Sequence, residues 1–497
     1  MGQYLDALGL VFQFYVLLAI AGGTLLGLIM GALPGLTAAM AIALLLPLTF
    51  GMPPVMGMGM LLGTLCGAIA GGSVSATLLN IPGTPSSVAT TLDAFPMARR
   101  GEAGRALGIA IVASFFGGIF SAIVLSLLAP PIADFALQFG PAEYFALSIF
   151  GLVIIASVAK TLMKGIIAGL IGLLLATVGT DPVAGVTRFT YGNFSLLTGI
   201  SLLPALIGLF AVSQVLTDVV DYFKAKAAQR SDVCMDKAAP RWLEVFRSWK
   251  VLGSSSIIGV IVGAIPGAGG SIASFLSYDQ AKKMSKTPEK FGTGHHEGIV
   301  ASESSNNSLV GGALIPMLTL GVPGEAATAV LMGGLMIQGI QPGPTLFTDQ
   351  APIIYGIFIA FLVANVFMLL IQWFGIRMFV KVLQVPRKIL MAMILVFCVI
   401  GVYAVDGDIF NVYLMLGFGV LGFFLNKYGF GTAPVILGLI LGPIAESNLR
   451  RALLLSGGDW SVLVSRPISL AFIGIAVAFL IFTYWQNSKH RGKAAHA

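Results

Sequence analysis

Four Pro-Gly steps stand inside apolar stretches of this chain, and each is surrounded by small side chains that carry hydroxyl or amide groups. The steps are Pro34-Gly35, Pro82-Gly83, Pro266-Gly267 and Pro323-Gly324. Proline removes a backbone donor and glycine permits a turn, so each step predicts a break in a helix. Within a bilayer such a break is tolerated only where protein or a water-filled cavity satisfies the freed backbone groups. The breaks are therefore the first candidates for a binding site.

The N-termini of the half-helices that begin after the breaks could hold an anion. No Lys or Arg lies at the breaks or beside them, so positive potential must come from the N-termini of the half-helices that begin there. Hydroxyl groups close to these N-termini add hydrogen bonds. We predict that the substrate contacts Pro34, Gly35, Thr37, Pro82, Gly83, Thr84, Ser86, Ser87, Pro266, Gly267, Gly269, Ser271, Pro323, Gly324 and Thr328.

A second set of side chains could hold a coupling cation, because freed carbonyls and side-chain oxygens suit Na⁺. The run S-E-S-S-N-N-S before the fourth break is too polar to face lipid. Glu325, directly after that break, either interacts with the helix dipole or carries a proton. The Asn and Ser residues either bind an ion or cap and stitch helices. We predict Na⁺ or H⁺ as coupling ion, with no other metal or cofactor, among Asn80, Ser302, Glu303, Asn306, Asn307 and Glu325.

The composition identifies an integral membrane protein. The chain has 497 residues and is 57% hydrophobic but only 10% charged, whereas soluble proteins carry about 25% charged residues. Runs such as 107–129, 351–374 and 468–485 are long enough to cross about 30 Å of hydrocarbon as helices. We therefore predict an all-α polytopic membrane protein with about 10–12 transmembrane helices plus broken helices or re-entrant hairpins. The net charge of +7 lies in loops, where it reports orientation rather than a nucleic-acid partner.

The breaks recur in matched order along the chain. The pattern G-x-x-x-G-A-x-P-G occurs at 27–35 and at 259–267, an offset of 259 minus 27, or 232. A Gly-Gly pair followed by Pro-Gly occurs at 71–83 and at 311–324, with offsets of 240 and 241. Two matched motifs in matched order predict an internal repeat.

Loop charges predict that the two repeats have opposite orientations. The segment 51–54 is uncharged and 99–105 is basic, whereas 282–290 is basic and 339–350 has no Lys or Arg. The positive-inside rule expects this reversal for inverted repeats, and inverted repeats with broken helices are common in secondary transporters.

The predicted domains follow from the repeat. Residues 1–216 form a first membrane repeat with breaks at 27–37 and 71–91 and added scaffold helices. Residues 217–250 form a basic cytoplasmic connector, and 251–497 form a second repeat with scaffold helices and breaks at 259–271 and 302–328. A glycine at every fourth position from Gly23 to Gly35 predicts close helix packing. The three cysteines, Cys66, Cys234 and Cys398, are too widely separated for a disulfide framework or a thiolate metal site.

Longer motifs resemble one family over nearly the whole chain. They are GALPGLT at 31–37, LLNIPGTPSS at 78–87, FGPAEYF at 139–145, GAIPGAGG at 263–270, and SNNS followed by GVPG at 305–324. Together they resemble the large membrane subunit of the tripartite tricarboxylate transporters. The resemblance implies a multi-pass secondary transporter of the bacterial inner membrane. Such a protein works with a small membrane subunit and a periplasmic solute-binding protein, and uses a cation gradient to import carboxylates such as citrate.

Three functions compete at this point. The first is a cation-coupled carboxylate importer of elevator-like or rocking type, surrounded by lipid. The second is a passive carboxylate channel. The third is a membrane-embedded serine hydrolase that pairs Ser271 or Ser302 with His295 or His296, but the sequence has no G-x-S-x-G motif. We predict a transporter and no enzyme activity. The adjacent histidines lack the i, i+4 spacing of a zinc-binding helix.

Overall fold

The computed structural model describes residues 2–156, 159, 161–181, 184–224, 239–383 and 385–494. Within this part of the chain the only strands are β1 (Gly179–Thr180) and β2 (Thr187–Arg188), which form a small antiparallel hairpin. The rest of the regular structure is helical, which confirms the all-α prediction. Much of the predicted connector, including Cys234, lies outside the described residues.

Helices long and apolar enough to cross a membrane are frequent. In the described part of the chain seven helices meet both criteria, and six shorter apolar helices accompany them. The three predicted spans lie within α6 (Ala103–Ala136), α17 (Ala351–Val382) and α22 (Pro467–Ala494). The predicted basic loop at 99–105 is wrong in one respect. The chain stays helical there through η3 (Ala98–Glu102) and turns at Gly101, which has a φ of 86° that glycine adopts without strain.

The described chain forms two compact units, and each takes segments from both halves of the sequence. Unit 1 comprises Met1–Ala133 and Asp218–Gly401, and it contains all four breaks. Unit 2 comprises Asp134–Thr217 and Val402–Ala497. The predicted repeats divide the chain by position in the sequence, whereas these two units are defined by which helices pack together. The predicted repeat boundaries therefore stay a prediction.

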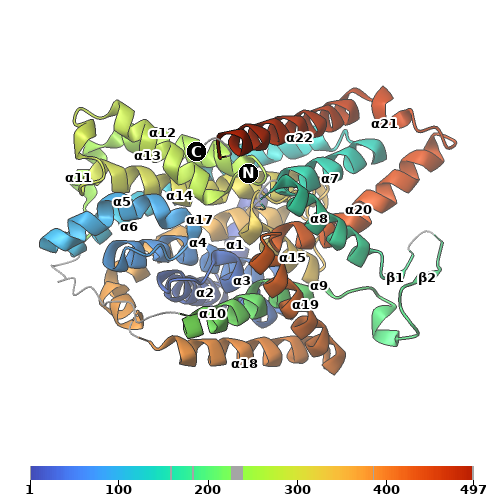
Figure 1. Ribbon diagram of the computed structural model, residues 1–497, viewed down its shortest axis with the longest axis horizontal. Helices are drawn as coiled ribbons and strands as arrows, with labels where there is room; N and C mark the ends of the chain where they lie inside the picture. Colours follow the sequence, from blue (N-terminus) through green and yellow to red (C-terminus); the bar gives the residue numbers. More distant parts are fainter. Residues whose placement is uncertain are drawn as a thin grey trace. The chain divides into compact units, whose positions relative to one another are not determined.

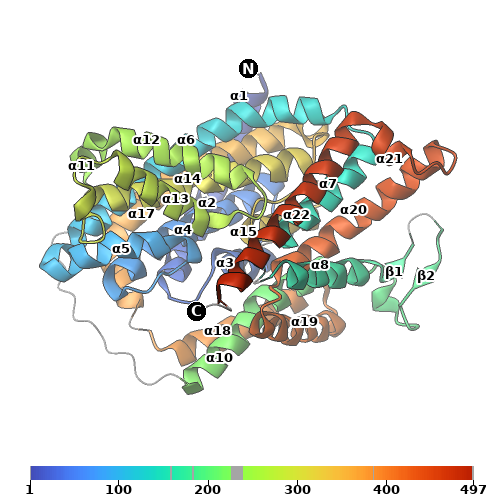
Figure 2. The same ribbon diagram turned by 45° about the horizontal axis from the view of Figure 1, so that its top comes forward.

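Unit 1 is built around two pairs of helices (Figure 1). In the first pair α2 packs along α4, and in the second α12 packs along α14, with α13 beside both (Figure 2). Helix α17 covers α2 and α4. The elements of unit 1 are α1 (Gly2–Val11), α2 (Phe14–Ala32), α3 (Ala38–Leu45), η1 (Leu46–Thr49), α4 (Pro54–Leu79), η2 (Pro85–Ser87), α5 (Val88–Met97), η3, most of α6, the end of α10 (Ser213–Lys224), α11 (Trp242–Arg247), α12 (Trp249–Ala264), α13 (Gly269–Met284), η6 (Pro288–Lys290), α14 (His296–Leu320), α15 (Ala326–Ile337), α16 (Leu346–Asp349), α17 and most of α18 (Arg387–Asp406).

Glycines allow α2 and α4 to touch backbone to backbone. A Cβ added at Gly23, Gly27 or Gly31 would lie 2.1, 2.2 or 2.0 Å from a carbonyl oxygen of α4. This confirms the predicted close-packing stripe at its first three positions. The prediction is wrong for Gly35, where an added Cβ would meet only Asp218 at 3.7 Å. Gly35 instead has a φ of 96° and makes the turn after the helix.

The same backbone contacts occur in both helix pairs. A Cβ added at Gly27 would meet the carbonyl group of Thr64, and a Cβ added at Gly259 would meet that of Ser305. A Cβ added at Gly83 would lie 2.1 Å from Gly31 O, and a Cβ added at Gly324 would lie 2.5 Å from Gly263 O. The positions in α2 and α12 differ by 232 in both contacts, as 259 minus 27 and 263 minus 31. The positions in α4 and α14, or in the breaks after them, differ by 241, as 305 minus 64 and 324 minus 83. The internal repeat predicted from the sequence therefore has a counterpart in packing.

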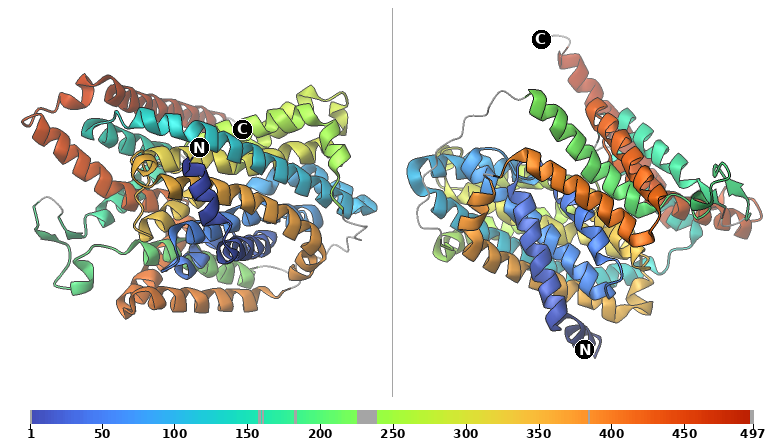
Figure 3. Two further views of the ribbon diagram at one scale, coloured as in Figure 1. Left: turned by 180° about the vertical axis from the view of Figure 1, so that it is seen from behind. Right: turned by 90° about the horizontal axis from the view of Figure 1, so that it is seen from below.

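Unit 2 is a separate helical bundle. Helix α20 packs against α7 and α8, and α22 lies beside α7 (Figure 3). The elements of unit 2 are the end of α6, α7 (Pro141–Ala156), α8 (Leu162–Ala176), β1, β2, η4 (Phe194–Leu196), α9 (Leu202–Leu206), η5 (Ile207–Val212), the first turn of α10, the last turn of α18, α19 (Ile409–Tyr428), α20 (Ala433–Leu455), α21 (Val462–Ser465) and α22.

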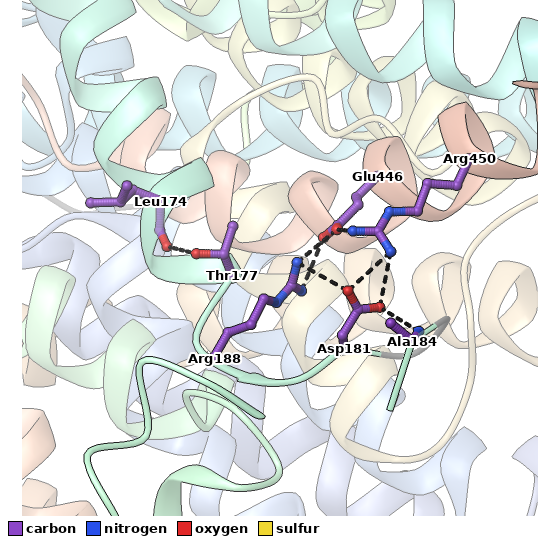
Figure 4. Close-up of polar contacts among 7 residues, drawn as sticks. All are labelled: Leu174, Thr177, Asp181, Ala184, Arg188, Glu446 and Arg450. Atoms are coloured by element: carbon purple, nitrogen blue, oxygen red, sulfur yellow. Dashed lines mark hydrogen bonds and ion pairs between the residues drawn. The ribbon is translucent and has the colours of Figure 1, made fainter. Parts of the chain in front are cut away.

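An ion-pair network ties the β1–β2 hairpin of unit 2 to α20 (Figure 4). Arg188 lies 2.8 Å from Glu446 and 3.5 Å from Asp181, while Arg450 lies 3.0 Å from Asp181 and 2.7 Å from Glu446. The hydrogen bonds that the Arg188 guanidinium donates to the Glu446 carboxylate raise the pKa of Arg188 above its ordinary value. Because the two positive and two negative charges balance, this network serves to fix the hairpin.

Candidate functional site at the helix breaks

The first and third breaks have the same local structure. Helix α2 ends at Ala32 and α12 at Ala264, and the following glycines, Gly35 and Gly267, have φ values of 96° and 79°. After the first break Thr37 caps α3, because its Oγ1 accepts a hydrogen bond from Met40 N at 3.2 Å. After the third break α13 begins directly at Gly269.

The second and fourth breaks also correspond. Helix α4 ends in a left-handed residue at Asn80, with a φ of 55°, and α14 ends in one at Gly321, with a φ of 70°. In each break the residue after Pro-Gly then contacts a hydroxyl three residues later. The Thr84 and Ser87 hydroxyls lie 2.9 Å apart, and Glu325 N donates to Thr328 Oγ1 at 3.0 Å.

The breaks of unit 1 are joined to one another by close contacts. The Gly83 contact with Gly31 joins the first break to the second, and Gly267 N donates to Gly324 O at 2.7 Å between the third and fourth. Ser271 Oγ donates to Pro85 O at 2.8 Å, which joins the third break to the second. Helix α15 packs on α3, so the half-helices after the fourth and first breaks are also neighbours.

The N-termini of two half-helices face each other within this group. A Cβ added at Gly270, in the first turn of α13, would lie 2.4 Å from Ser86 Cβ in η2, which leads into α5. Ser86 and Thr84 share a hydrogen bond of 3.1 Å, and both are buried. The first turn of α13 and the start of η2–α5 thus lie against each other, and the N-terminus of a helix attracts negative charge.

Asn306 of α14 is buried beside these N-termini without a hydrogen-bond partner. Its side chain is 0% exposed, and among the described residues neither its Oδ1 nor its Nδ2 is hydrogen-bonded. Oδ1 would lie 3.6 Å from a Cβ at Gly270. Leaving a buried polar group unpaired costs about 1–3 kcal/mol, so such a group in a folded protein calls for an explanation. A ligand bound between the half-helices supplies one.

Glu303, one turn before Asn306 on α14, forms a second buried polar cluster. Its Oε1 lies 2.5 Å from Thr90 Oγ1 on α5, and its Oε2 accepts from Ser114 Oγ on α6 at 2.9 Å. Thr90 Oγ1 also lies 3.0 Å from Ser302 Oγ. Glu303 is 0% exposed, and no Lys, Arg or His among the described residues forms an ion pair with it.

The other predicted cation-binding residues have different surroundings. Asn80 is exposed at the end of α4, Ser302 Oγ donates to Gly298 O at 2.9 Å, and Asn307 Nδ2 donates to Glu303 O at 3.0 Å. These three fit the alternative of capping or stitching helices. Glu325 is half-buried at the start of α15. Of the predicted cation-binding residues, Ser302, Asn306 and Asn307 thus lie within about one helical turn of Glu303, whereas Asn80 and Glu325 lie on other elements.

The sequence reasoning did not single out Asp93, Thr90 or Ser114, which the structure places in this region. Asp93 of α5 is 0% exposed, and its Oδ1 accepts from the backbone N–H groups of 292, 294 and 295 at 3.0, 2.7 and 2.7 Å. Its Oδ2 accepts from the Tyr278 hydroxyl at 2.7 Å. Asp93 therefore holds α5 against α13 and the loop before α14. An acid inside an apolar stretch is a recognisable signal for such a role.

The two histidines stand at the start of α14, His295 as its N-cap and His296 as its first residue, and neither is paired with a catalytic serine among the described residues. His295 Nε2 lies 3.2 Å from Thr287 Oγ1, and the rings of His295 and His296 stack. The serines of the hydrolase alternative have other hydrogen bonds, Ser271 to Pro85 O and Ser302 to Gly298 O. Among the described residues, therefore, neither serine is paired with a histidine.

Comparison with known proteins gives one family. The model of the tripartite tricarboxylate transporter TctA family matches residues 17–437. The chain is 38% identical, over 92% of its length and 91% of the other's, to an uncharacterized 52.8 kDa protein in the TAR-I ttuC′ 3′ region of Agrobacterium vitis.

It is also 37% identical to an uncharacterized protein in the TAR-II ttuC′ 3′ region of the same organism, over 45% of this chain and 92% of that one. No solved structure matches this chain.

Proposed function

This chain belongs to the tripartite tricarboxylate transporter TctA family, and from this premise we propose that it is a cation-coupled importer of di- or tricarboxylates such as citrate. In this proposal it lies in the bacterial inner membrane. It receives substrate from a periplasmic binding protein and works with a small membrane subunit. The word tripartite in the family description supports the presence of partners.

The observation that carries the proposal is the meeting of two half-helix N-termini beside Asn306. A carboxylate needs hydrogen-bond donors and positive potential, and the N-termini of α13 and of η2–α5 offer both. The hydroxyls of Thr84, Ser86 and Ser271 stand at the same N-termini, and the Asn306 amide can donate to the substrate. The predicted substrate-binding residues are all uncharged, and no Lys or Arg stands at the breaks or beside them in the sequence. The helix ends are therefore the main source of positive potential.

The contents of the two units favour different roles for them in transport. Unit 1 contains every break and the buried polar residues around Asn306, whereas unit 2 contains none of them. We propose that unit 1 carries the substrate and that unit 2 is the scaffold of an elevator-like or rocking movement.

Counterflow of radiolabelled citrate in proteoliposomes tests this function. Wild-type protein is expected to exchange external citrate with internal citrate and, given a sodium or pH gradient, to accumulate it. Exchange without gradient-driven accumulation would favour the passive channel. The absence of both would contradict the proposal.

The Thr84→Ala variant tests the site in the same assay. Loss of the hydroxyl removes one hydrogen bond at the η2 N-terminus and the contacts with Ser86 and Ser87. We expect citrate exchange to fall about tenfold, equivalent to about 1.4 kcal/mol. Thr177→Ala is the control, because Thr177 Oγ1 only donates to Leu174 O within unit 2. Equal exchange by both variants would count against the site.

A further inference from the structure

The buried cluster of Glu303, Thr90, Ser302 and Ser114, here called the Glu303 cluster, lacks one hydrogen when Glu303 is ionised. It has four hydrogen-bond contacts: Glu303 with Thr90, Glu303 with Ser114, Thr90 with Ser302, and Ser302 with the carbonyl groups of Gly298 and Ile299, which share the one Ser302 hydrogen. Three hydroxyls supply three hydrogens, because each Ser or Thr hydroxyl donates once. One contact is therefore left without a hydrogen.

A proton on Glu303 completes the cluster. The carboxyl group then donates from Oε1 to Thr90 Oγ1, Thr90 donates to Ser302 Oγ, and Ser302 donates to Gly298 O. Ser114 still donates to Oε2, so all four contacts have a hydrogen. Hydrogen positions are assigned by such counting. Protonation also removes the cost of an ionised carboxylate that is 0% exposed and has no basic partner among the described residues.

The first repeat shows that this polar cluster is not needed for packing. The offset of 241 that relates α4 to α14 places Leu61, Leu62 and Leu65 at the positions of Ser302, Glu303 and Asn306. All three leucines are 0% exposed. The same helix position is therefore filled by leucine in one repeat and by a carboxylic acid in the other. A residue needed only to fill the core would not differ in this way.

The cluster lies next to the proposed anion site. Thr90 is three residues after Ser87 on the half-helix whose N-terminus faces Gly270, and Glu303 is three residues before Asn306. An ionised Glu303 would repel a bound carboxylate across this short separation, whereas a neutral one would not. Substrate and proton therefore favour each other's binding, and by linkage the effect is reciprocal.

We propose that Glu303 binds the proton that crosses the membrane with the anionic substrate, and that Thr90 and Ser302 support its protonated form. This inference rests on the proposed function and names the coupling ion. The proton is taken from the side on which substrate binds and leaves the Glu303 Oε1 on the side of release. No other bond forms or breaks.

The other titratable groups on the helices around Glu303 do not form ion pairs with it among the described residues. Asp93 binds Tyr278 and three backbone N–H groups, and Arg105 pairs with Glu102 and Glu244. The remaining groups from α11 to the start of α15 are Arg247, Lys250, Asp279, Lys282, Lys283, Lys286, Glu289, Lys290, His295, His296, Glu297 and Glu325. None of the described ones forms an ion pair with Glu303.

Glu303→Gln is the test variant, because it mimics a permanently neutral side chain. We expect it to lose accumulation driven by a pH gradient, to the level of vesicles without protein. Wild-type citrate affinity is expected to weaken as the pH rises, and that of Glu303→Gln to stay constant. Glu289→Gln, an exposed change in the loop before α14, is the control and is expected to behave as wild type.

Infrared difference spectra of the purified full chain provide a second readout that needs no transport. Wild-type and Glu289→Gln protein are expected to show the carbonyl band of a buried protonated carboxylic acid, and Glu303→Gln to lack that band. Thr90→Val, which keeps the shape but removes the hydroxyl, is expected to shift it.

The outcomes separate the two proposals. If Glu303→Gln accumulates citrate in a pH gradient as wild type does, or if the band is unchanged in this variant, the proton site is wrong and the transport function stands. Accumulation driven by sodium alone, with no effect of pH, likewise overturns it. If wild-type protein carries no citrate, the proposed function fails and the coupling role fails with it, while the infrared band still decides the protonation of Glu303.

Discussion

Replacing Asn306 by leucine is expected to reduce citrate exchange to background while leaving the protein folded. Leucine stands at the corresponding position of the first repeat, Leu65, and is fully buried there, so the helix pair accepts this side chain. The substitution removes a buried amide that lacks a hydrogen-bond partner among the described residues. If that amide binds the substrate, its loss costs about 1.5–3 kcal/mol of binding, or about 10- to 150-fold in affinity.

The stability of the same variant distinguishes loss of substrate binding from loss of folding. Because the amide has no partner in the described structure, its replacement is expected to leave the thermal unfolding temperature unchanged or raised. Asn448→Leu is the control, since the Asn448 amide donates to Ile444 O at 2.8 Å in unit 2. Exchange by Asn306→Leu at the wild-type rate would show that Asn306 does not contact the substrate.

The second large effect is expected at Asp93, on stability. Asp93→Ala removes the acceptor of three backbone N–H groups and of the Tyr278 hydroxyl, all close to a fully buried position. Hydrogen bonds to a charged group contribute about 1.5–3 kcal/mol each, and donors left unpaired add to the loss. We therefore expect a loss of at least about 3 kcal/mol in the free energy of unfolding, with little protein recovered from the membrane in folded form.

Tyr278→Phe gives the scale for this effect. It removes one of the four hydrogen bonds and is expected to cost about 1.5–3 kcal/mol, measured as a shift of the thermal transition in detergent. Asp93→Asn is expected to lie between the two other variants, because an amide oxygen still accepts from N–H groups. A fully stable Asp93→Ala protein would mean that the loop before α14 does not depend on this residue.

The sequence predicted the broken helices because Pro-Gly steps leave few alternatives in an apolar stretch. Pro82-Gly83 and Pro323-Gly324 both follow a helix that ends in a left-handed residue, and a proline inside the stretch keeps the helix from continuing because it lacks a backbone N–H. The repeat was also visible, since its offsets are properties of the sequence. The division into units was not, because it depends on which helices pack together after the chain folds.

The candidate site was predictable in its location and less so in its members. Hydroxyls after a break, such as Thr84 and Ser86, are adjacent to it in sequence. Thr90, by contrast, meets Glu303 across 213 residues of chain, and no local pattern reports that contact. Asn306 and Asn307 are neighbours with the same chemistry, yet only the first lacks a hydrogen-bond partner among the described residues. Their difference depends on the side of α14 that faces η2 and α13.

A structure of the full chain with citrate bound tests the central claim most directly. The account predicts density for the carboxylate between the first turn of α13 and η2, within hydrogen-bond distance of the Asn306 amide and with no Lys or Arg in contact. Citrate held by a basic side chain, or bound away from these two N-termini, would contradict it.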